Sequence, residues 1–351
     1  MPAQYEGNAI TKAARAKVGG GFESAIEASG SVVITGSGFG PAPNVVQFRN
    51  FEEGVTGSQI QTAAPAGQVG NFDLVTANAK YQDFGGRKVF AGFDSGIKES
   101  CVFVNGASFT RFRQFVTLAV PDSGVFPGSA GTGLRTFPTD SGMKAAWLML
   151  SDNGNNTGIA EADIVLPTHT GSGRLRAQGN SVDPSFFMYN GTGDDFWAWN
   201  EFNSFGFVCP ADLNNPKTVA VDLELFMTSS KAGTVVRTKN IAAFTGTDSS
   251  VTDANAAYDR VKYNAFARDA GGSAQIYYSD MYLAVESSPA ANDFVQCLFL
   301  GNAATFAACT ELRPVLADTW TDTEVTFTNR YSLSYYHLVK PDGSVVSGAA
   351  S

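Results

Sequence analysis

Histidine, closely spaced cysteine and charge are all scarce in this chain of 351 residues. It has 2 histidines and 4 cysteines, and 16% of its residues are charged. No Cys-x-x-Cys pair occurs, so the spacing typical of a zinc site is missing. We expect the cysteines to be reduced, buried side chains. They are Cys101, Cys209, Cys297 and Cys309.

Motifs for nucleophilic catalysis are lacking as well. The sequence contains no Gly-x-Ser-x-Gly, and His169 has no obvious nucleophile beside it. His337 falls in a predicted strand, where packing against neighbouring tyrosines is expected. The members of a Ser-His-Asp triad meet only in space, so the sequence leaves that alternative open. The residues themselves predict a protein without enzymatic activity.

The distribution of charge argues against two classes of partner. The net charge is −9, and Lys and Arg form no cluster of the kind that phosphate contacts require. Nucleic acid is therefore not expected as a ligand. No membrane span is predicted. Lys12, Arg15 and Lys17 interrupt the apolar core that a secretory signal would need.

Glycine and aromatic residues, by contrast, are plentiful. The chain has 37 Gly, 27 Phe and 11 Tyr, which suits many short strands joined by tight turns. Several runs alternate with period two, as Val219, Val221, Leu223 and Leu225 do. The composition and patterning predict an all-β fold with a core large enough to need no metal or disulfide.

The segment Ser31-Val-Val-Ile-Thr-Gly-Ser-Gly-Phe-Gly40 predicts a strand followed by a glycine-rich turn. Its β-branched residues favour a strand, and the glycines allow positive φ on either side of Phe39. The run resembles the first strand of IPT/TIG domains, an immunoglobulin-like family. In that family the next strands follow directly, and here they do not.

Matching segments occur near the other end of the chain. Trp320, Thr323, Val325 and Phe327 resemble the penultimate strands of the family, after the apolar run 294–301. The resemblance implies a discontinuous immunoglobulin-like β-sandwich built from residues 31–43 and 293–351. One large β-sandwich whose edge strands carry these residues is the alternative.

Residues 44–288 would then form an inserted domain. Its opening Phe48-Arg-Asn-Phe-Glu-Glu-Gly54 and its closing strand 276–284 resemble the corresponding segments of concanavalin-like jelly rolls in bacterial and phage proteins. An insertion needs its ends close together, so these two strands are expected to pair. The predicted fold class is all-β, with a jelly-roll sandwich inserted into a small immunoglobulin-like sandwich.

Residues 1–30 are predicted to be a short N-terminal arm. Ala9–Val18 reads as one marginal helix, ended by the glycines at 19–21. Ordering about 30 residues costs on the order of 30 kcal/mol, so we expect the arm to anchor on a partner, and folding back on its own sandwich is the alternative. The anchoring side chains would be Lys12, Arg15, Lys17 and Phe22.

Carboxylates and indole rings suggest a sugar site. Asp222 and Glu224 alternate onto one face of a strand, and Trp197, Trp199 and Glu201 could line the same groove. Indole rings stack on sugar rings, and jelly-roll glycosidases use paired carboxylates. The two acids could equally be the solvated face of a half-buried strand.

Oxygen ligands also suggest a cation site. Glu52, Glu53 and Asp280 could bind Ca²⁺ where the first and last strands of the inserted domain meet. No other cofactor is expected.

Together these features favour a non-enzymatic structural protein on the virion surface of a tailed phage, as a capsid decoration, head fibre or tail fibre. Its partners would be other virion proteins, bound through residues 1–30, and a host surface glycan, with a homo-oligomer expected. The alternative is a carbohydrate-binding or polysaccharide-degrading jelly-roll protein, either a lyase or a hydrolase. A fold resemblance raises such a hypothesis without establishing it.

Overall fold

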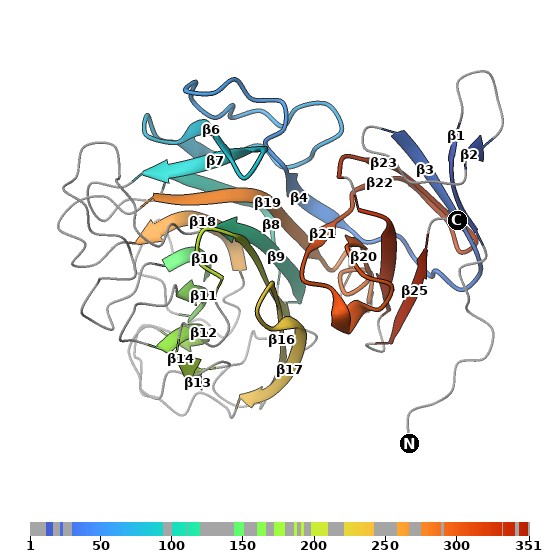
Figure 1. The fold of residues 1–351 in the computed structure, drawn as a ribbon. Coiled ribbons are helices and arrows are strands. Elements are labelled where there is room, and N and C mark those ends of the chain that lie inside the picture. Colours follow the sequence, from blue (N-terminus) through green and yellow to red (C-terminus); the bar gives the residue numbers. More distant parts are fainter. Residues whose placement is uncertain are drawn as a thin grey trace.

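The computed structural model contains four stacked β-sheets (Figure 1). All strand pairs among the described residues are antiparallel. The structure describes residues 12–16, 22–23, 30–93, 100–109, 111–119, 144–150, 160–165, 172–179, 186–187, 191–192, 198–209, 221–241, 258–266, 275–288, 291–331, 333–340 and 344–349.

Two of the sheets form a small sandwich, which we call the base module. The outer base sheet contains, in order, β2 (Phe22–Glu23), β1 (Lys12–Ala16), β3 (Gly30–Thr35), β23 (Glu324–Asn329) and β22 (Ala317–Trp320). The inner base sheet contains β21 (Leu312–Pro314), β20 (Cys297–Gly301), β24 (Tyr335–Val339) and β25 (Val345–Ala349). A short 3-10 helix, η2 (Phe306–Ala308), lies between β20 and β21.

The other two sheets form the inserted sandwich. The central sheet, which faces the base module, contains β17 (Gly233–Ile241), β16 (Val221–Ser229), β15 (Phe202–Cys209), β9 (Phe112–Ala119), β19 (Gln275–Val285), β7 (Arg87–Phe93) and β6 (Lys80–Phe84), with β4 (Val45–Arg49) also beside β19. The distal sheet contains β13 (Phe186–Phe187), β12 (Ser172–Gly179), β11 (Ala160–Val165), β10 (Lys144–Leu150), β18 (Tyr258–Phe266), β8 (Cys101–Phe109) and β5 (Leu74–Val75), with β14 (Gly191–Thr192) beside β12.

The base module joins segments that lie almost 300 residues apart in the sequence. Val325 of β23 lies opposite Ile34 of β3, and Phe327 lies opposite Val32. All four of these side chains are buried, whereas Glu324 is exposed. This alternation places one face of the outer base sheet on the inner base sheet. The two sheets share a core with Leu298, Leu300, Tyr336 and Leu338.

The glycine-rich turn after β3 fixes Phe39 in this core. Gly38 and Gly40 have φ of 67° and 72°, a region that side chains with a Cβ rarely enter. The amide of Gly40 donates to Asp322 Oδ1 at 3.0 Å, and Trp320 Nε1 donates to the Gly40 carbonyl at 3.1 Å. Phe39 is 2% exposed as a result.

The ends of the inserted sandwich are adjacent, as predicted. β4 pairs with β19, with Phe48 opposite Tyr282 and Arg49 opposite Met281. The predicted fold class, an all-β chain with one sandwich inserted into another, is confirmed. The exact domain boundaries and the IPT/TIG assignment stay predictions.

One expectation about the arm is wrong. Residues 12–16 form strand β1 and not a helix, and Ala13 lies opposite Ile34 of β3. The edge of β3 offers unpaired backbone groups to any neighbouring segment, and this pairing outweighs the marginal helical tendency of an alanine-rich run of ten residues. The arm therefore extends the chain's own base module at this point.

Truncation of a buried side chain in the core of the base module should destabilise the fold. We expect Phe327→Ala to lower the free energy of unfolding by about 3–5 kcal/mol, because a fully buried ring leaves a cavity between the two base sheets. Glu324→Ala, three strand positions away on the exposed face, should change it by less than about 0.5 kcal/mol. Denaturant unfolding of both variants checks this, and equal losses would contradict the shared core.

Candidate functional site: a charged cluster between the sandwiches

The base module covers the outer face of the central sheet. Phe115 and Phe226 of the central sheet contact Phe299 of β20, at ring-centre distances of 5.2 and 5.6 Å. Phe306 of η2 packs on Phe226 at 5.3 Å. These rings belong to one hydrophobic core, which also includes Tyr282. Aromatic packing of this kind excludes water and ligand from the middle of the face.

Polar contacts fix the base module in place around this core. Ser204 Oγ of β15 donates to the carbonyl of Leu312 at 3.3 Å, and Thr234 Oγ1 of β17 donates to the carbonyl of Cys309 at 2.8 Å. At the other end of the sheet, Arg113 Nε donates to the carbonyl of Val295 at 2.9 Å.

The structure separates the residues of the predicted sugar site. Glu224 lies opposite Val208 on β15, whereas Glu201 immediately precedes Phe202 at the other end of that strand. Six strand residues span about 20 Å, so the acids of β16 and Glu201 do not share one groove. Glu224 lies 4.0 Å from Arg113 and is 28% exposed.

The structure describes only some of the other residues with a predicted functional role. Trp199 is partly buried and Glu201 is exposed, both just before β15. Trp197 and the side chain of Asp222 lie outside the described residues, as does His169. The anchoring side chains Lys12, Arg15 and Phe22 fall on β1 and β2, of which only the backbone is described, and Lys17 lies outside. Their predicted role is untested.

Two of the three predicted calcium ligands have other partners. Glu53 accepts hydrogen bonds from Tyr81 at 2.7 Å and from Gln68 at 2.8 Å, and Asp280 pairs with Arg313. Within the described part of the chain, no group of three His, Cys, Asp or Glu side chains is placed to hold a metal ion. The calcium site therefore gains no support from this geometry.

Three aromatic rings gather at the corner of the central sheet that β6, β7 and the start of β15 form. Phe84 stacks on Tyr277 with ring centres 4.4 Å apart, and it meets Phe202 edge-on at 5.5 Å. All three side chains are partly exposed. We call this group the aromatic shelf.

A cluster of charges adjoins the aromatic shelf, and both sandwiches contribute to it. Arg87 of β7 forms an ion pair with Glu311, which also accepts from Arg313 Nε at 3.1 Å. The guanidinium groups of Arg87 and Arg313 lie 5.3 and 5.1 Å from the ring centre of Phe202. Arg87 Nη1 and Arg313 Nη2 are buried and have no hydrogen-bond partner among the described residues. The charged cluster, as we use the term, comprises Glu52, Arg87, Asp280, Glu311, Arg313 and Tyr331.

Asp280 is the buried centre of the charged cluster. Its carboxylate accepts hydrogen bonds from Tyr331 and from Arg313, and Ser279 Oγ donates to it at 2.8 Å. Burial raises the pKa of Asp280 to about 7, although the Tyr331 hydrogen bond and the nearby Arg87 act in the opposite direction. Asp280 and Arg313 are both 0% exposed, so neither charge has access to solvent.

Glu52 is the exposed acid of the charged cluster. Partial removal from water raises the pKa of its carboxyl above the usual range, and the neighbouring Glu53 raises it further. Arg87, Arg330 and Lys88 lower it by a smaller amount. An accessible carboxyl with a raised pKa beside a fixed cation is a candidate for proton transfer.

His337 takes part in a separate buried contact within the base module. Its Nε2 lies 3.2 Å from Cys309 Sγ, and its Nδ1 lies 2.7 Å from Ser347 Oγ. Burial lowers the pKa of His337 to about 4 and raises the pKa of Cys309. Both groups are therefore neutral at pH 7, and a neutral thiol is a poor nucleophile. All four cysteines are free and buried, as expected.

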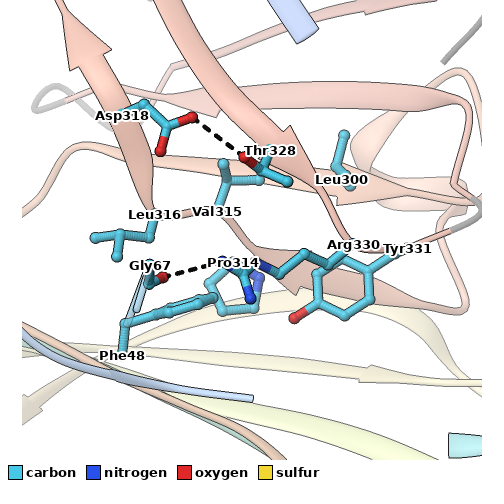
Figure 2. A pocket seen from close by; sticks show the side chains of 10 residues that line it. All are labelled: Phe48, Gly67, Leu300, Pro314, Val315, Leu316, Asp318, Thr328, Arg330 and Tyr331. Atoms are coloured by element: carbon cyan, nitrogen blue, oxygen red, sulfur yellow. Dashed lines mark hydrogen bonds between the residues drawn. The ribbon is translucent and has the colours of Figure 1, made fainter. Parts of the chain in front are cut away.

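A narrow hollow lies along the seam between the modules. Figure 2 shows it between Phe48 and Gly67 of the inserted sandwich and Asp318, Thr328 and Arg330 of the base module. It has room for about one water molecule, so no sugar ring fits it. The aromatic shelf and the charged cluster are thus the better candidate site.

Comparison with known proteins gives structural matches only. No family model and no curated protein matches the chain. Among the solved structures that match, alginate lyase Aly36B is 11% identical with a TM-score of 0.43, over 70% of this chain and 100% of that one. A marine alginate lyase from Aplysia kurodai is 10% identical with a TM-score of 0.41, over 66% of this chain and 100% of its own. Alginate lyase vAL-1 from Chlorella virus is 12% identical with a TM-score of 0.35, over 62% and 93%.

These matches contradict the prediction of a non-enzymatic protein, because polysaccharide lyases are among the structures that resemble this chain. That prediction is withdrawn. The virion, capsid and fibre assignments find no support in the comparison. The described part of the chain contains no helix that is both long and apolar enough to cross a membrane.

Sequence reasoning missed most of the charged cluster. Arg87, Glu311, Arg313 and Tyr331 belong to no motif, and about 220 residues separate the first two. One signal was available: Arg313 stands next to Pro314 in an otherwise apolar strand, and a cation in such a strand needs a buried partner.

The buried ion pair should show strong coupling. We expect Arg313→Met to destabilise the fold by about 3–5 kcal/mol, because Asp280 keeps its burial and loses its principal cation. The double variant Asp280→Leu/Arg313→Met should recover more than half of that loss. Urea unfolding checks the prediction, and additive losses would show that the two side chains do not act as a pair.

His337 predicts a loss of stability in acid. Its pKa is about 6.5 in the unfolded chain and about 4 in the fold, so the unfolded state binds the extra proton between these values. The free energy of unfolding should fall by up to about 3 kcal/mol as the pH drops from 6.5 to 4. His337→Gln should lack this contribution. Denaturant unfolding of the parent protein and of the variant, each at pH 4.5 and at pH 7, measures it. If acid lowers the free energy of unfolding equally in the parent and in the variant, His337 is not the group responsible.

Proposed function

We propose that this chain is a carbohydrate-active protein that binds an acidic polysaccharide on the aromatic shelf and cleaves it beside the charged cluster. The observation that carries the proposal is the juxtaposition of partly exposed stacked rings, Phe84 and Tyr277, with the partly exposed guanidinium group of Arg87. Aromatic rings accept the apolar faces of sugars, and guanidinium groups bind carboxylates well.

Glu52 is the group that we assign to proton transfer. Cleavage of a glycosidic bond requires a proton on the leaving oxygen, whether water adds to the sugar or the sugar loses a proton to form a double bond. Because its pKa is raised by partial burial, the Glu52 carboxyl keeps its proton to a higher pH than an ordinary glutamate does. Its exposure gives a substrate direct access to it.

Binding should depend on the stacked rings. We expect Tyr277→Ala to weaken polysaccharide binding about tenfold, or ~1.4 kcal/mol, because the sugar loses one stacking face. Tyr277→Phe keeps the ring and should bind almost as the parent does. Calorimetric titration with alginate, polygalacturonate and a neutral glucan measures this, and absence of binding to every polymer would refute the proposed function.

Cleavage should depend on Glu52. We expect Glu52→Gln to lower the cleavage rate by about 10²–10⁴-fold while binding stays unchanged, because the amide keeps the shape and cannot donate the proton. Asp83→Asn provides the matched control, since Asp83 is a neighbouring carboxylate that is 59% exposed and pairs with Lys88. New reducing ends report hydrolysis and unsaturated ends report elimination. Full activity in Glu52→Gln would exclude this residue as the acid.

A further inference from the structure

We infer that the site recognises the end of a polysaccharide chain and not an internal stretch. The inference rests on the proposed function and adds to it which part of the polysaccharide the site accepts. It follows from how the base module and one loop of the inserted sandwich close the corner that contains the aromatic shelf.

The base module closes one side of the aromatic shelf. Arg313 and Tyr331 stand directly behind Phe202: the guanidinium of Arg313 lies 5.1 Å from the Phe202 ring centre and 5.5 Å from the Tyr331 ring centre. Glu311, on the same strand region, holds Arg87 by an ion pair. A sugar that moves along the shelf toward the base module therefore meets fixed, buried side chains.

This closure continues along β15, β16 and β9 of the central sheet. The contacts begin at Ser204, two residues after Phe202, and extend through Phe226 to Arg113 at the opposite end. Sheets in face-to-face contact lie about 10 Å apart with interdigitated side chains. No glycan can pass between the central sheet and the inner base sheet while this packing persists.

A loop of the inserted sandwich closes a second side of the corner that contains the aromatic shelf. Arg330 Nη2 donates to the Gly67 carbonyl at 3.3 Å, which attaches loop 50–68 to the base module (Figure 2). Gly67 has φ of 74°, and a Cβ there would approach Arg330 Nη2 to 2.3 Å, so the contact requires this glycine. The hollow beneath it admits about one water and gives a polymer no exit.

Glu52 is carried by this same loop, close to Arg87. A chain that lies on Phe84 and Tyr277 thus ends against the charged cluster, with its terminal unit beside Glu52. The partly exposed guanidinium of Arg87 lies near Glu52 at that end of the shelf. A terminal sugar presents hydroxyl oxygens that an internal sugar has committed to glycosidic bonds, and a guanidinium donor held in place by an ion pair favours such acceptors.

The test counts protein molecules bound per polysaccharide chain. Narrow fractions of polygalacturonate, from about ten to about a hundred units long, are titrated with the full chain carrying Glu52→Gln. We expect the number bound per chain to stay constant as length increases tenfold. Val236→Ala in the same background, a change at a 46% exposed position on β17, should give the same counts.

A second readout uses the active protein. End recognition predicts that one small product dominates from the first moments of cleavage, with the remaining polymer losing length slowly. A count that rises in proportion to chain length, or early products of mixed size, would overturn the inference and leave the proposed function intact. Absence of binding at every length would overturn both.

Discussion

The antiparallel pairing of β3 with β23 closes the base module and holds the two ends of the inserted sandwich together. Val32 and Ile34 bury the same face as Val325 and Phe327, and neither pair has a complete core without the other. The entropic cost of closing so long a loop grows only with the logarithm of its length. The inserted sandwich reduces that cost further, because β4 and β19 pair and bring its own ends side by side.

Closure of the base module determines which surface of the inserted sandwich remains available. The inner base sheet lies on the central sheet through Phe299 and Phe306, so most of that face is part of a core. Among the described residues, the aromatic shelf at its corner stays partly exposed. The same packing buries Asp280 and Arg313. The two must pair, because an unpaired charge at a site buried from solvent would destabilise the fold.

Some of this architecture is legible in the sequence. The alternation in β3 and β23 and the turn glycines around Phe39 follow from local sterics and period-two burial, and they indicate strands wherever they occur. The helix expected at Ala9–Val18 shows where such reasoning fails: an isolated helix of this length is marginal, and the available edge of β3 decides the outcome. Similarly, Glu201 and Glu224 satisfy one pattern, yet the register of β15 with β16 keeps them apart.

The sequence by itself determined the all-β class, the core-facing positions of the base strands and the adjacency of the ends of the insertion, because each depends on alternation and turn chemistry within a few residues. The tertiary structure alone decided that Arg87, Asp280, Glu311 and Arg313 meet, and that the base module covers the central sheet. Ion pairing and the packing of sheet on sheet depend on distances in space. Contacts between residues 224 and 33 positions apart leave no local signal of that proximity in the sequence.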